Sequence, residues 1–535
     1  MKKVFAITGG TLLVAGLGLI APSTSTAAPD PGGNPAAAAT EYIQENPAKV
    51  LGSADDAYAV TDTIASKNGE SHVRFTRSYD NLPVLGGDFV VHLTAADKTN
   101  GLSLAQTKTI KASTTPGIKK AQAAQKARGE FTGKDIGKAG DPRLVIDARK
   151  GEPVLAWKTT VTGMQADGQT PSRQIIVTDA NTGTVRSATE TITTPIRVGQ
   201  VTKQGSAKPQ PNGVAATGSG RGIFVGNVTL NTTGSGSSYS MVDTTHGSNR
   251  TCDLQNRTAT CTTFTDADNA WGNGTQSDRA SAGVDAHYGA AKTFDYFKLT
   301  FGRNGIFNNG AGVPSRVHYG NNYVNAYWDG SQMTYGDGTN NQNPLVALDV
   351  AGHEMTHGVT ENTANLNYSG DAGGLNESTS DIFGTMVEFF ANNPSDTPDF
   401  LIGEKINING NGTPLRYMDD PSKDGVSYKC WSTAVPSSDP HYSSGVGNHF
   451  FFLLANGSGQ SAYGNSPTCN GSTVTGIGRD KAAAIWFATL NQYMTSTETY
   501  AKARLDTVSA ATDLYGASSA EVQATKAAWS AVSVN

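Results

Sequence analysis

The sequence predicts an α+β protein in which a small α+β unit precedes a domain of two lobes with a cleft between them. Three patterns in its 535 residues predict this fold. Residues 50–192 combine one helical stretch with several strand-like stretches, residues 221–345 are rich in strand-like segments between Gly and Asn turns, and the apolar spacing from about residue 346 is mainly helical. A β-rich half followed by a helical half favours two lobes with a ligand site at their seam.

The N-terminus has the pattern of a secretory signal at 1–28. A positive start, Met1-Lys2-Lys3, precedes a 17-residue apolar stretch at 4–20, and small residues follow up to Ala28. The apolar stretch is interrupted by Gly and is shorter than the about 20 residues of a membrane span. We therefore expect a secreted, extracellular protein that has no membrane contact once the signal is removed.

Residues 29–212 contain the small α+β unit. A leader rich in Pro, Gly and Ala at 29–40 is expected to be flexible, and two modules follow at about 50–115 and at 118–192. The second module begins with an Ala- and Lys-rich helix at 119–131. Alternation of apolar and polar residues predicts strands at 71–79, 84–93, 143–146, 153–161, 174–178 and 185–191.

A stretch rich in Lys, Gln, Pro, Gly and Ser at 195–220 is expected to be an exposed linker and a processing site. The β-rich lobe is expected at 213–355, with one helix inside it at 280–299, and the helical lobe at 356–535. The helical candidates around the seam and beyond it are 345–359, 376–391, 445–457, 481–493 and 497–514.

The formal charge of −5 is unevenly distributed along the chain. Residues 29–210 carry 22 Lys and Arg against 18 Asp and Glu, whereas residues 211–535 carry 17 against 28. A nucleic-acid-binding protein usually presents a basic patch, so we expect no nucleic-acid partner. The opposite net charges of the two parts would favour their docking on each other.

The four cysteines, Cys252, Cys261, Cys430 and Cys469, all lie in the second of these parts. In an exported protein they are expected to form two disulfides rather than a metal site. The sequence alone allows three pairings. We favour Cys252–Cys261 and Cys430–Cys469, because each of these bonds joins neighbours in the sequence.

The strongest chemical signal is the motif His353-Glu354-Met355-Thr356-His357. In a helix, positions i and i+4 share one face, so His353 and His357 can bind one Zn²⁺ together. Glu354 would lie next to the ion without coordinating it. This is the position of a general base that takes a proton from a water molecule.

A third ligand is needed, and Glu377 provides one 20 residues after His357. A turn rich in Gly and Asn between them lets a second helix return antiparallel to the first. Two His and one Glu leave a fourth position for water, which is the catalytic arrangement. Asp381, one turn beyond Glu377, is expected to accept a hydrogen bond from the distal nitrogen of His353; the alternative is an ordinary acid on a helix surface.

Five segments carry a family resemblance: Asn325-Ala326-Tyr327-Trp328, Met333-Thr334-Tyr335-Gly336-Asp337-Gly338, His353 to His357, Gly374 to Asp381, and His441-Tyr442-Ser443-Ser444-Gly445. With them the sequence resembles the thermolysin-like (bacillolysin) secreted neutral zinc metallopeptidases from about residue 50 to its C-terminus. The resemblance implies a zymogen with zinc in the cleft. It also implies that residues 29–212 are a two-module propeptide that assists folding and blocks the cleft.

The resemblance implies further roles around the zinc site. Tyr368 and His441 would stabilise the oxyanion that develops on the substrate carbonyl; packing is the alternative role for both. The acidic partner that this His usually has five residues upstream is Pro436 here, and Asp439 could replace it.

The same resemblance implies how substrate would be bound. Asn325 and Ala326 would hold the substrate backbone as an edge strand. Arg416 would bind a substrate carbonyl, with a surface ion pair as the alternative. Val350 and Leu415 would line an apolar pocket for the residue after the scissile bond.

Calcium is also implied, by Asp349, Glu388, Asp399 and Glu404. Clustered carboxylates repel one another unless a hard cation binds them. One further acidic position of the family is Leu401 here, so we expect one ion rather than two at this place.

These observations predict a secreted, monomeric, zinc-dependent endopeptidase that is made as an inactive precursor. Its substrates would be polypeptides cut on the amino side of hydrophobic residues. Two alternatives stay open: a secreted zinc- and calcium-binding protein that has lost catalysis, and a zinc hydrolase of non-peptide amides.

Overall fold

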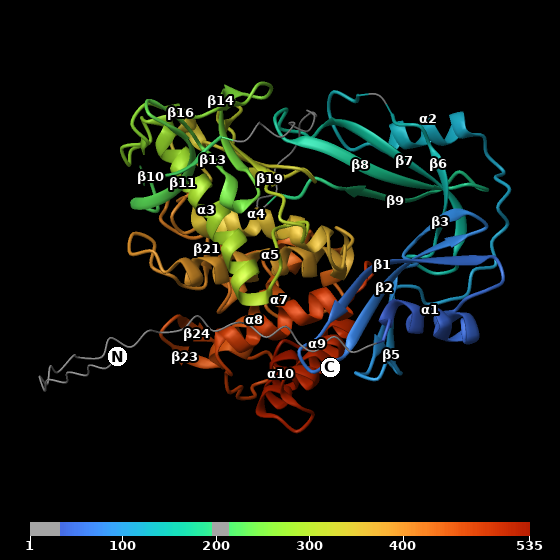
Figure 1. Ribbon diagram of the computed structural model, residues 1–535. Coiled ribbons are helices and arrows are strands. Elements are labelled where there is room, and N and C mark those ends of the chain that lie inside the picture. Colours follow the sequence, from blue (N-terminus) through green and yellow to red (C-terminus); the bar gives the residue numbers. More distant parts are fainter. Residues whose placement is uncertain (1–32, 138, 195–212) are drawn as a thin grey trace, which may run out of the picture.

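The computed structural model describes residues 33–137, 139–194 and 213–535. The signal peptide expected at 1–28 and most of the linker expected at 195–220 lie outside the described residues. Figure 1 shows an N-terminal unit, coloured blue to cyan, beside a larger body of two lobes. The predicted α+β class and the order of a β-rich lobe before a helical lobe are confirmed.

The N-terminal unit (described residues 33–194) contains two helices, α1 (Pro35–Glu45) and α2 (Lys120–Glu130), and nine strands. The strands are β1 (Asp56–Ala65), β2 (Ser71–Tyr79), β3 (Leu82–Leu85), β4 (Phe89–Leu93), β5 (Thr99–Leu104), β6 (Arg143–Asp147), β7 (Val154–Met164), β8 (Pro171–Asp179) and β9 (Val185–Glu190). The expected helix at 119–131 and the expected strands therefore correspond to elements of the structure. The stretch 84–93 forms two strands rather than one.

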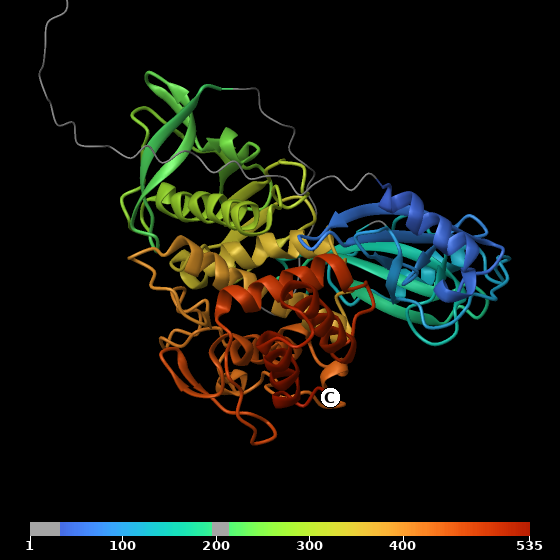
Figure 2. The ribbon, with the colours of Figure 1, turned by 60° about the horizontal axis from the view of Figure 1, so that its bottom comes forward.

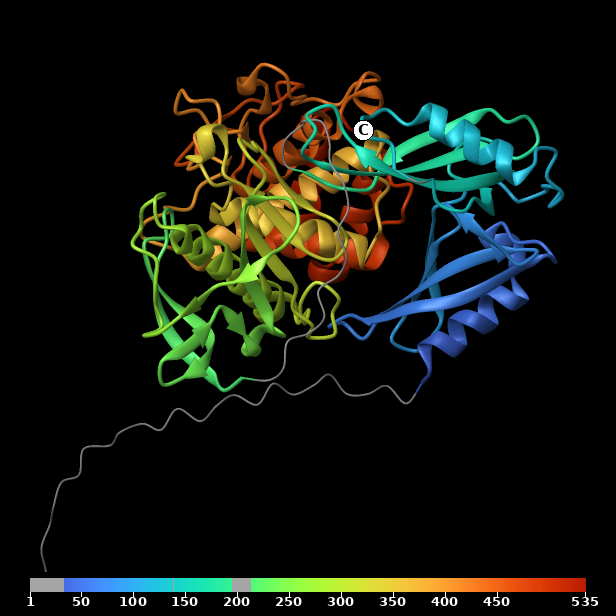
Figure 3. The same ribbon diagram turned by 90° about the horizontal axis from the view of Figure 1, so that it is seen from above.

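The two expected modules share one sheet. Its strand order is β5-β4-β2-β3-β6-β7-β8-β9, and β1 pairs with β2. The parallel pair β3–β6 joins the modules through Val84 opposite Ile146 and Leu85 opposite Asp147. Each module keeps a hydrophobic cluster of its own, beside α1 and beside α2. The modules therefore form one continuous unit with two cores (Figure 3).

The prediction of a flexible leader at 29–40 is wrong in part, because α1 occupies residues from Pro35 onward. Asn34 caps this helix, with its Oδ1 accepting from the Ala37 N–H at 3.1 Å, and Pro35 stands at the first helical position, where its missing N–H costs nothing. Ala39 and Ile43, one turn apart, are buried. The Pro and Gly residues around the run of Ala favoured a flexible segment, whereas the Ala residues themselves are the strongest helix formers.

The β-rich lobe contains β10 to β20 and the helix α3 (Arg279–Phe301). Its strands are β10 (Ala215–Arg221), β11 (Asn227–Ser235), β12 (Ser238–Ser240), β13 (Val242–Asp243), β14 (Asn249–Arg257), β15 (Thr262–Thr263), β16 (Thr265–Asp266), β17 (Ala270–Trp271), β18 (Pro314–Tyr319), β19 (Ala326–Trp328) and β20 (Met333–Gly336). Because β10 pairs along its whole length with β11, residues 215–220 are strand and not linker. One sheet ends in β19, which among the described strands pairs with β20 alone.

The helical lobe begins with α4 (Leu348–Glu361), which crosses the lobe boundary expected at residue 355. The other elements are α5 (Gly370–Ala391), β21 (Leu401–Ile402), β22 (Arg416–Tyr417), α6 (Pro440–Ser443), α7 (Gly445–Asn456), β23 (Gly459–Ser461), β24 (Gly464–Ser466), α8 (Arg479–Ala488), a π-helix (Thr489–Tyr493), α9 (Tyr500–Tyr515) and α10 (Ala520–Ala531). Figure 2 shows α4 and α5 in the middle of the body, with α3 on one side and the later helices on the other.

Both expected disulfides are present, Cys252–Cys261 and Cys430–Cys469, and the described residues contain no free cysteine. The first tethers the loop after β14, and the second ties the segment before α6 to the loop before α8. Among the described residues, no helix combines the length and the apolarity that a membrane span requires.

Candidate metal centre

Glycines let α4 and α5 pack unusually close together. A Cβ at Gly384 would lie 2.4 Å from the backbone oxygen of Asp349, and a Cβ at Gly352 would lie 2.9 Å from the Cα of Gly384. Side chains larger than hydrogen would therefore force these helices apart. The close approach places the N-terminal half of α5 directly against the motif on α4.

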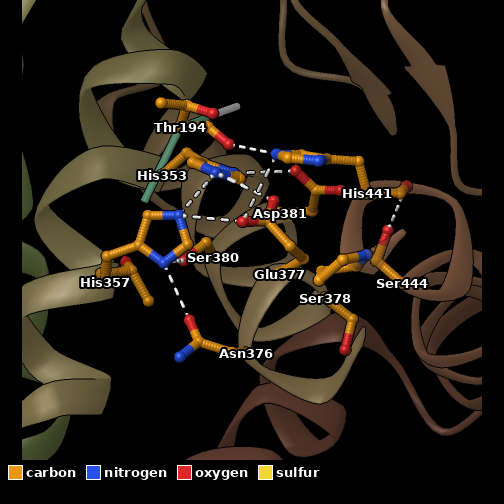
Figure 4. A network of polar contacts seen from close by, with 12 residues as sticks. Thr194, His353, His357, Asn376, Glu377, Ser378, Ser380, Asp381, His441 and Ser444 are labelled. Atoms are coloured by element: carbon orange, nitrogen blue, oxygen red, sulfur yellow. Dashed lines mark hydrogen bonds and ion pairs between the residues drawn. The ribbon is translucent and has the colours of Figure 1, made fainter. Parts of the chain in front are cut away.

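The three predicted zinc ligands converge between these helices (Figure 4). The Nε2 atoms of His353 and His357 are 3.0 Å apart, and the Glu377 carboxylate oxygens lie 3.5 Å from the first and 3.3 Å from the second. Tetrahedral bonds of about 2.0–2.1 Å to one ion would place ligand atoms roughly 3.3 Å apart. The three groups are buried and have the spacing of a zinc site.

Hydrogen bonds on the far side of each ring fix which nitrogen faces the centre. His353 donates from Nδ1 to Asp381 Oδ1 at 2.9 Å, and the Nδ1 of His357 lies 2.8 Å from Asn376 Oδ1 and 3.1 Å from Ser380 Oγ. Both Nε2 lone pairs therefore point at one another and at a carboxylate. Lone pairs in this arrangement repel unless a cation lies among them, so the donor set fits Zn²⁺.

Asp381 has two more partners than the sequence predicts. Arg416 binds it through two hydrogen bonds, from Nε at 2.8 Å and from Nη2 at 2.7 Å, and Asn448 donates to it at 2.8 Å. Burial opposes ionisation of this carboxyl, but Arg416 and His353 hold its pKa far below the usual range. Asp381 is therefore an anion that orients His353, and Arg416, expected to bind a substrate carbonyl, also supports the metal centre.

Glu354 lies on α4 beside the three ligands and is fully buried. Burial raises its pKa well above the usual value, and the nearby Glu377 carboxylate adds to the rise; the backbone of Trp328 and the charge of Arg416 oppose it. A carboxyl group with a raised pKa accepts and returns a proton readily.

Tyr368 and His441 both lie against the Glu377 carboxylate. The Tyr368 hydroxyl donates to Glu377 Oε1 and lies 3.3 Å from His441 Nε2. His441 Nδ1 donates to Asp439 Oδ1 at 2.6 Å, so Asp439 takes the place that Pro436 cannot fill. Asp439 is also the N-cap of α6, which carries His441.

Two acceptors fix the charge of the His441 ring. Its Nδ1 faces the Asp439 carboxylate, and its Nε2 donates to the backbone oxygen of Thr194, in the N-terminal unit. Burial opposes protonation, but Glu377 and Asp439 raise the pKa of His441 above the usual value. The ring therefore carries two protons and is a cationic donor.

The predicted substrate-binding residues lie at the start of β19, on α4 and at β22. Asn325 is buried, with its side chain accepting from the Ala326 N–H at 2.9 Å, and Ala326 begins the edge strand β19. Val350 is buried on α4, and Leu415 is half-buried immediately before β22. The apolar pocket expected between Val350 and Leu415 stays a prediction.

A second cluster of carboxylates lies at the far end of α5. Oxygens of Glu388, Asp396 and Glu404 fall within 4.8 Å of one another, and both oxygens of the buried Glu388 lack a hydrogen-bond donor among the described residues. Asp349 and Asp399 adjoin the cluster; each accepts one backbone N–H, from Gly403 at 2.6 Å and from Leu401 at 2.7 Å.

Burial raises the pKa of every member of this cluster, and repulsion between the carboxylates adds to the rise for all of them except Asp399. The pKa of Asp349 rises to about 7, that of Glu404 to about 9 and that of Glu388 to about 12. Sequence reasoning missed Asp396, which lies in the loop between α5 and Glu404. Its acidic side chain in a loop next to two expected ligands was the available signal.

Three family models match the chain. The thermolysin metallopeptidase catalytic domain matches residues 217–361, and the alpha-helical domain of the same metallopeptidases matches residues 364–534. The fungalysin/thermolysin propeptide motif matches residues 56–103, within the N-terminal unit.

Similar proteins carry related names. The transglutaminase-activating metalloprotease of Streptomyces mobaraensis is 48% identical over 96% of this chain and 67% of its own length. A bacillolysin of Bacillus cereus is 47% identical over 60% of this chain and 56% of its own length. A thermolysin of Alicyclobacillus acidocaldarius subsp. acidocaldarius is 34% identical over 92% of this chain and 88% of its own length.

The Asp381 network leads to a prediction for metal affinity. Asp381→Asn should weaken zinc binding by about 10- to 100-fold, because the orienting partner of His353 loses its charge and Arg416 loses its counter-ion. Competition with a chromophoric chelator measures the dissociation constant. Asp480→Asn, on the exposed start of α8, is the matched control and should bind zinc like the wild type. Unchanged affinity in Asp381→Asn would show that Asp381 does not orient the ligand.

Proposed function

Because the chain belongs to the thermolysin family of metallopeptidases, and is therefore a zinc metalloendopeptidase made with a propeptide, we propose which residues perform its chemistry and where it acts. We propose that the precursor is exported, and that the mature protein hydrolyses extracellular polypeptides on the amino side of hydrophobic residues. The observation that carries the proposal is the convergence of one nitrogen from each of two imidazole rings with one carboxylate, next to the buried carboxyl group of Glu354.

The reaction would be addition of water to a peptide carbonyl. Zinc held by His353, His357 and Glu377 would supply a Lewis acid that polarises the carbonyl and lowers the pKa of water towards about 7. Glu354 takes the proton from the attacking water and passes it to the leaving nitrogen as the C–N bond breaks. No Ser or Cys nucleophile is required.

His441 and Tyr368 stabilise the negative charge that develops on the carbonyl oxygen. His441 donates from Nε2 as an imidazolium, because Asp439 holds its other nitrogen, and Tyr368 donates from its hydroxyl. Donors that are already oriented in a buried site stabilise such a transition state. Removing one of them by mutation raises the activation free energy by about 2.7–4 kcal/mol.

Substrate would add as an antiparallel strand to the free edge of β19, and Val350 and Leu415 would line the pocket for the residue after the cut bond.

The alternative of a protein that has lost catalysis is disfavoured, because Glu354 is present and buried beside the ligands. Hydrolysis of non-peptide amides would use the same residues, and a panel of peptides and simple amides separates the two activities.

The carboxylate cluster supports a calcium site. Glu388, Asp396 and Glu404 would be the central ligands, with Asp349 and Asp399 beside them. Hard oxygen ligands are those that Ca²⁺ prefers. Lys405 already neutralises one edge of the cluster, with its Nζ 3.3 Å from Asp396, which supports one ion rather than two.

The N-terminal unit would act as inhibitor and folding aid through a buried contact with the helical lobe. Arg74 on β2 donates to three backbone oxygens at the end of the π-helix, those of Leu490, Asn491 and Met494, at 2.9–3.0 Å. Asp88 accepts from the Ser496 N–H at 2.8 Å. Burial lowers the pKa of Arg74, and four acidic groups oppose this: first Asp88 and Asp62 of its own unit, then Asp506 and Glu498 of the helical lobe.

Glu354→Gln tests the assigned chemistry. The variant should keep its zinc, measured by metal analysis, and lose casein hydrolysis by at least about 10²-fold, the contribution of a general base. Glu521→Gln, which removes only an ion pair with Lys481 at the start of α10, is the control and should stay active. A mature wild-type protein that binds zinc but cleaves no unfolded protein would instead support the binding-protein alternative.

Calcium should raise the melting temperature of the wild type, because a ligand at 100 times its dissociation constant stabilises by about 2.7 kcal/mol. Glu388→Gln should lose this rise and yet be about as stable as the wild type without calcium, because the raised pKa of Glu388 keeps its carboxyl group protonated there and Gln replaces one neutral group with another. Scanning calorimetry with and without calcium measures both effects. A calcium-dependent rise that survives in Glu388→Gln would place the ion elsewhere.

Arg74→Met should loosen the contact of the N-terminal unit, since each hydrogen bond from a charged group contributes about 1.5–3 kcal/mol. Hydrogen exchange of the precursor should show faster exchange of amides in residues 490–497. Arg143→Met, at the exposed start of β6, should leave this exchange unchanged. Equal protection of the amides in residues 490–497 in both variants would show that Arg74 does not contribute to the docking contact.

A further inference from the structure

The helix α8 continues into a π-helix (Thr489–Tyr493), and the helical hydrogen bonds end directly after it. The N–H of Met494 donates to the Thr489 oxygen at 2.9 Å. The next two N–H groups, those of Thr495 and Ser496, donate instead to side-chain carboxylates, at 3.1 Å and 2.8 Å. The backbone oxygens at this helix end must therefore accept from a side chain or from water. Turns of π-helix are rare and frequently lie at functional sites.

One guanidinium group of the N-terminal unit meets three of these oxygens. Arg74 lies on β2 and is only 8% exposed. It donates from Nε to the Asn491 oxygen at 2.9 Å, and from Nη2 and Nη1 to the Leu490 and Met494 oxygens, each at 3.0 Å. Each nitrogen of the planar group thus has an oxygen of its own. A lysine ammonium is a point charge without such a plane, so the arrangement is specific for a guanidinium.

Two acidic side chains of the helical lobe lie near the same guanidinium, and each has an oxygen without a donor. Glu498 is 1% exposed, and its Oε2 accepts from Lys502 Nζ at 3.2 Å. Its Oε1 and the Oδ2 of Asp506 have no hydrogen-bond partner among the described residues. Burial and then Glu498 raise the pKa of Asp506 to about 8, against Lys502 and Arg74. When Arg74 leaves with the N-terminal unit, Lys502 stays but one of these two cations is lost.

The same place is connected to the metal centre. A cavity of about 820 Å³ between the N-terminal unit and the enzyme is lined by Arg74 and Ser496 and also by His357 and Tyr368. A polypeptide bound at the metal centre can therefore extend along this hollow once the N-terminal unit has gone. The acceptor oxygens remain, because all of them belong to the helical lobe.

The acceptor groups of the helical lobe form one site, which we call the guanidinium site. It comprises the backbone oxygens of Leu490, Asn491 and Met494 and the carboxyl groups of Glu498 and Asp506. We propose that the mature enzyme uses the guanidinium site to bind an arginine side chain of its polypeptide substrate; this inference rests on the proposed function. Arg74 occupies the site in the precursor, and an arginine of the chain being cut takes its place afterwards. Selection of substrates then has two parts, a hydrophobic residue at the cut bond and an arginine remote from it.

Calcium fits the guanidinium site less well than arginine does. Ca²⁺ needs about 6–8 oxygens at roughly 2.3–2.6 Å from a single point. The three backbone oxygens instead surround a planar group and face three different nitrogens of it. Their spacing therefore matches hydrogen bonds to a flat cation rather than coordination of a spherical one.

A small probe tests the site on the unaltered mature enzyme. Ethylguanidinium reproduces the end of an arginine side chain, and ethylurea is a neutral analogue of the same shape. At twice its dissociation constant ethylguanidinium should slow hydrogen exchange of the amides in residues 490–497 by about threefold. Ethylurea at the same concentration should leave this exchange unchanged. The measurement needs no variant, so it does not depend on how a substitution affects folding.

Casein tests the role of the site in substrate selection. Casein whose arginines have been converted to citrulline keeps its hydrophobic residues but loses the guanidinium charges. For the mature wild type, kcat/KM should be at least about 10-fold lower on this casein, which corresponds to one hydrogen bond from a charged group. Glu498→Gln should narrow the difference, whereas Asp480→Asn, on the exposed start of α8, should keep it. Both variants remove one negative charge, so a general attraction between enzyme and casein would change equally in the two.

Three results would each overturn the proposal: equal kcat/KM on the two caseins, exchange in residues 490–497 that responds equally to ethylguanidinium and ethylurea, or a Glu498→Gln enzyme that keeps the full difference. Failure of the proposed function gives a different result, since a mature wild type without peptidase activity would cut neither casein.

Discussion

The close packing of α4 on α5 is the constraint on which the rest of the structure depends. Two glycines, Gly352 and Gly384, let the helix backbones approach within a distance that any side chain would prevent. Only at this separation can the Glu377 carboxylate meet the His353 and His357 rings. The metal centre is thus a consequence of backbone packing, and its ligands come from the rigid middle of the molecule.

Two carboxylates orient histidine rings around this centre. Asp381, held by Arg416 and Asn448, orients one ring, and Asp439 holds His441 so that its other nitrogen points into the cleft. Because every one of these groups lies in or beside the buried centre, each interaction acts with little screening by solvent. His441, which would donate to a substrate carbonyl, donates to the Thr194 backbone oxygen in the precursor.

The sequence predicted the local chemistry well and the long-range contacts poorly. The helical spacing of His353 and His357, and the position of Glu377 after a turn, depend on short segments, and the structure places these side chains together. Arg74 and Asn448 act across distances in the chain that no local pattern reveals. Asp396 was missed although it lies in the loop between Glu388 and Glu404. The Gly-rich start of α5 was expected to be a turn, because the packing that requires glycine there comes from Pro440, Ser443 and Tyr500, far away in sequence. Helix α1 was missed because the burial of Ile43 depends on a sheet formed later in the chain.

Zinc-edge anomalous diffraction from crystals of the zinc-loaded precursor would locate the ion. We expect a strong peak at about 2.0–2.2 Å from the Nε2 atoms of His353 and His357 and from a Glu377 oxygen. A strong zinc peak at another group of side chains, or a map in which Glu377 points away from the ion, would contradict it.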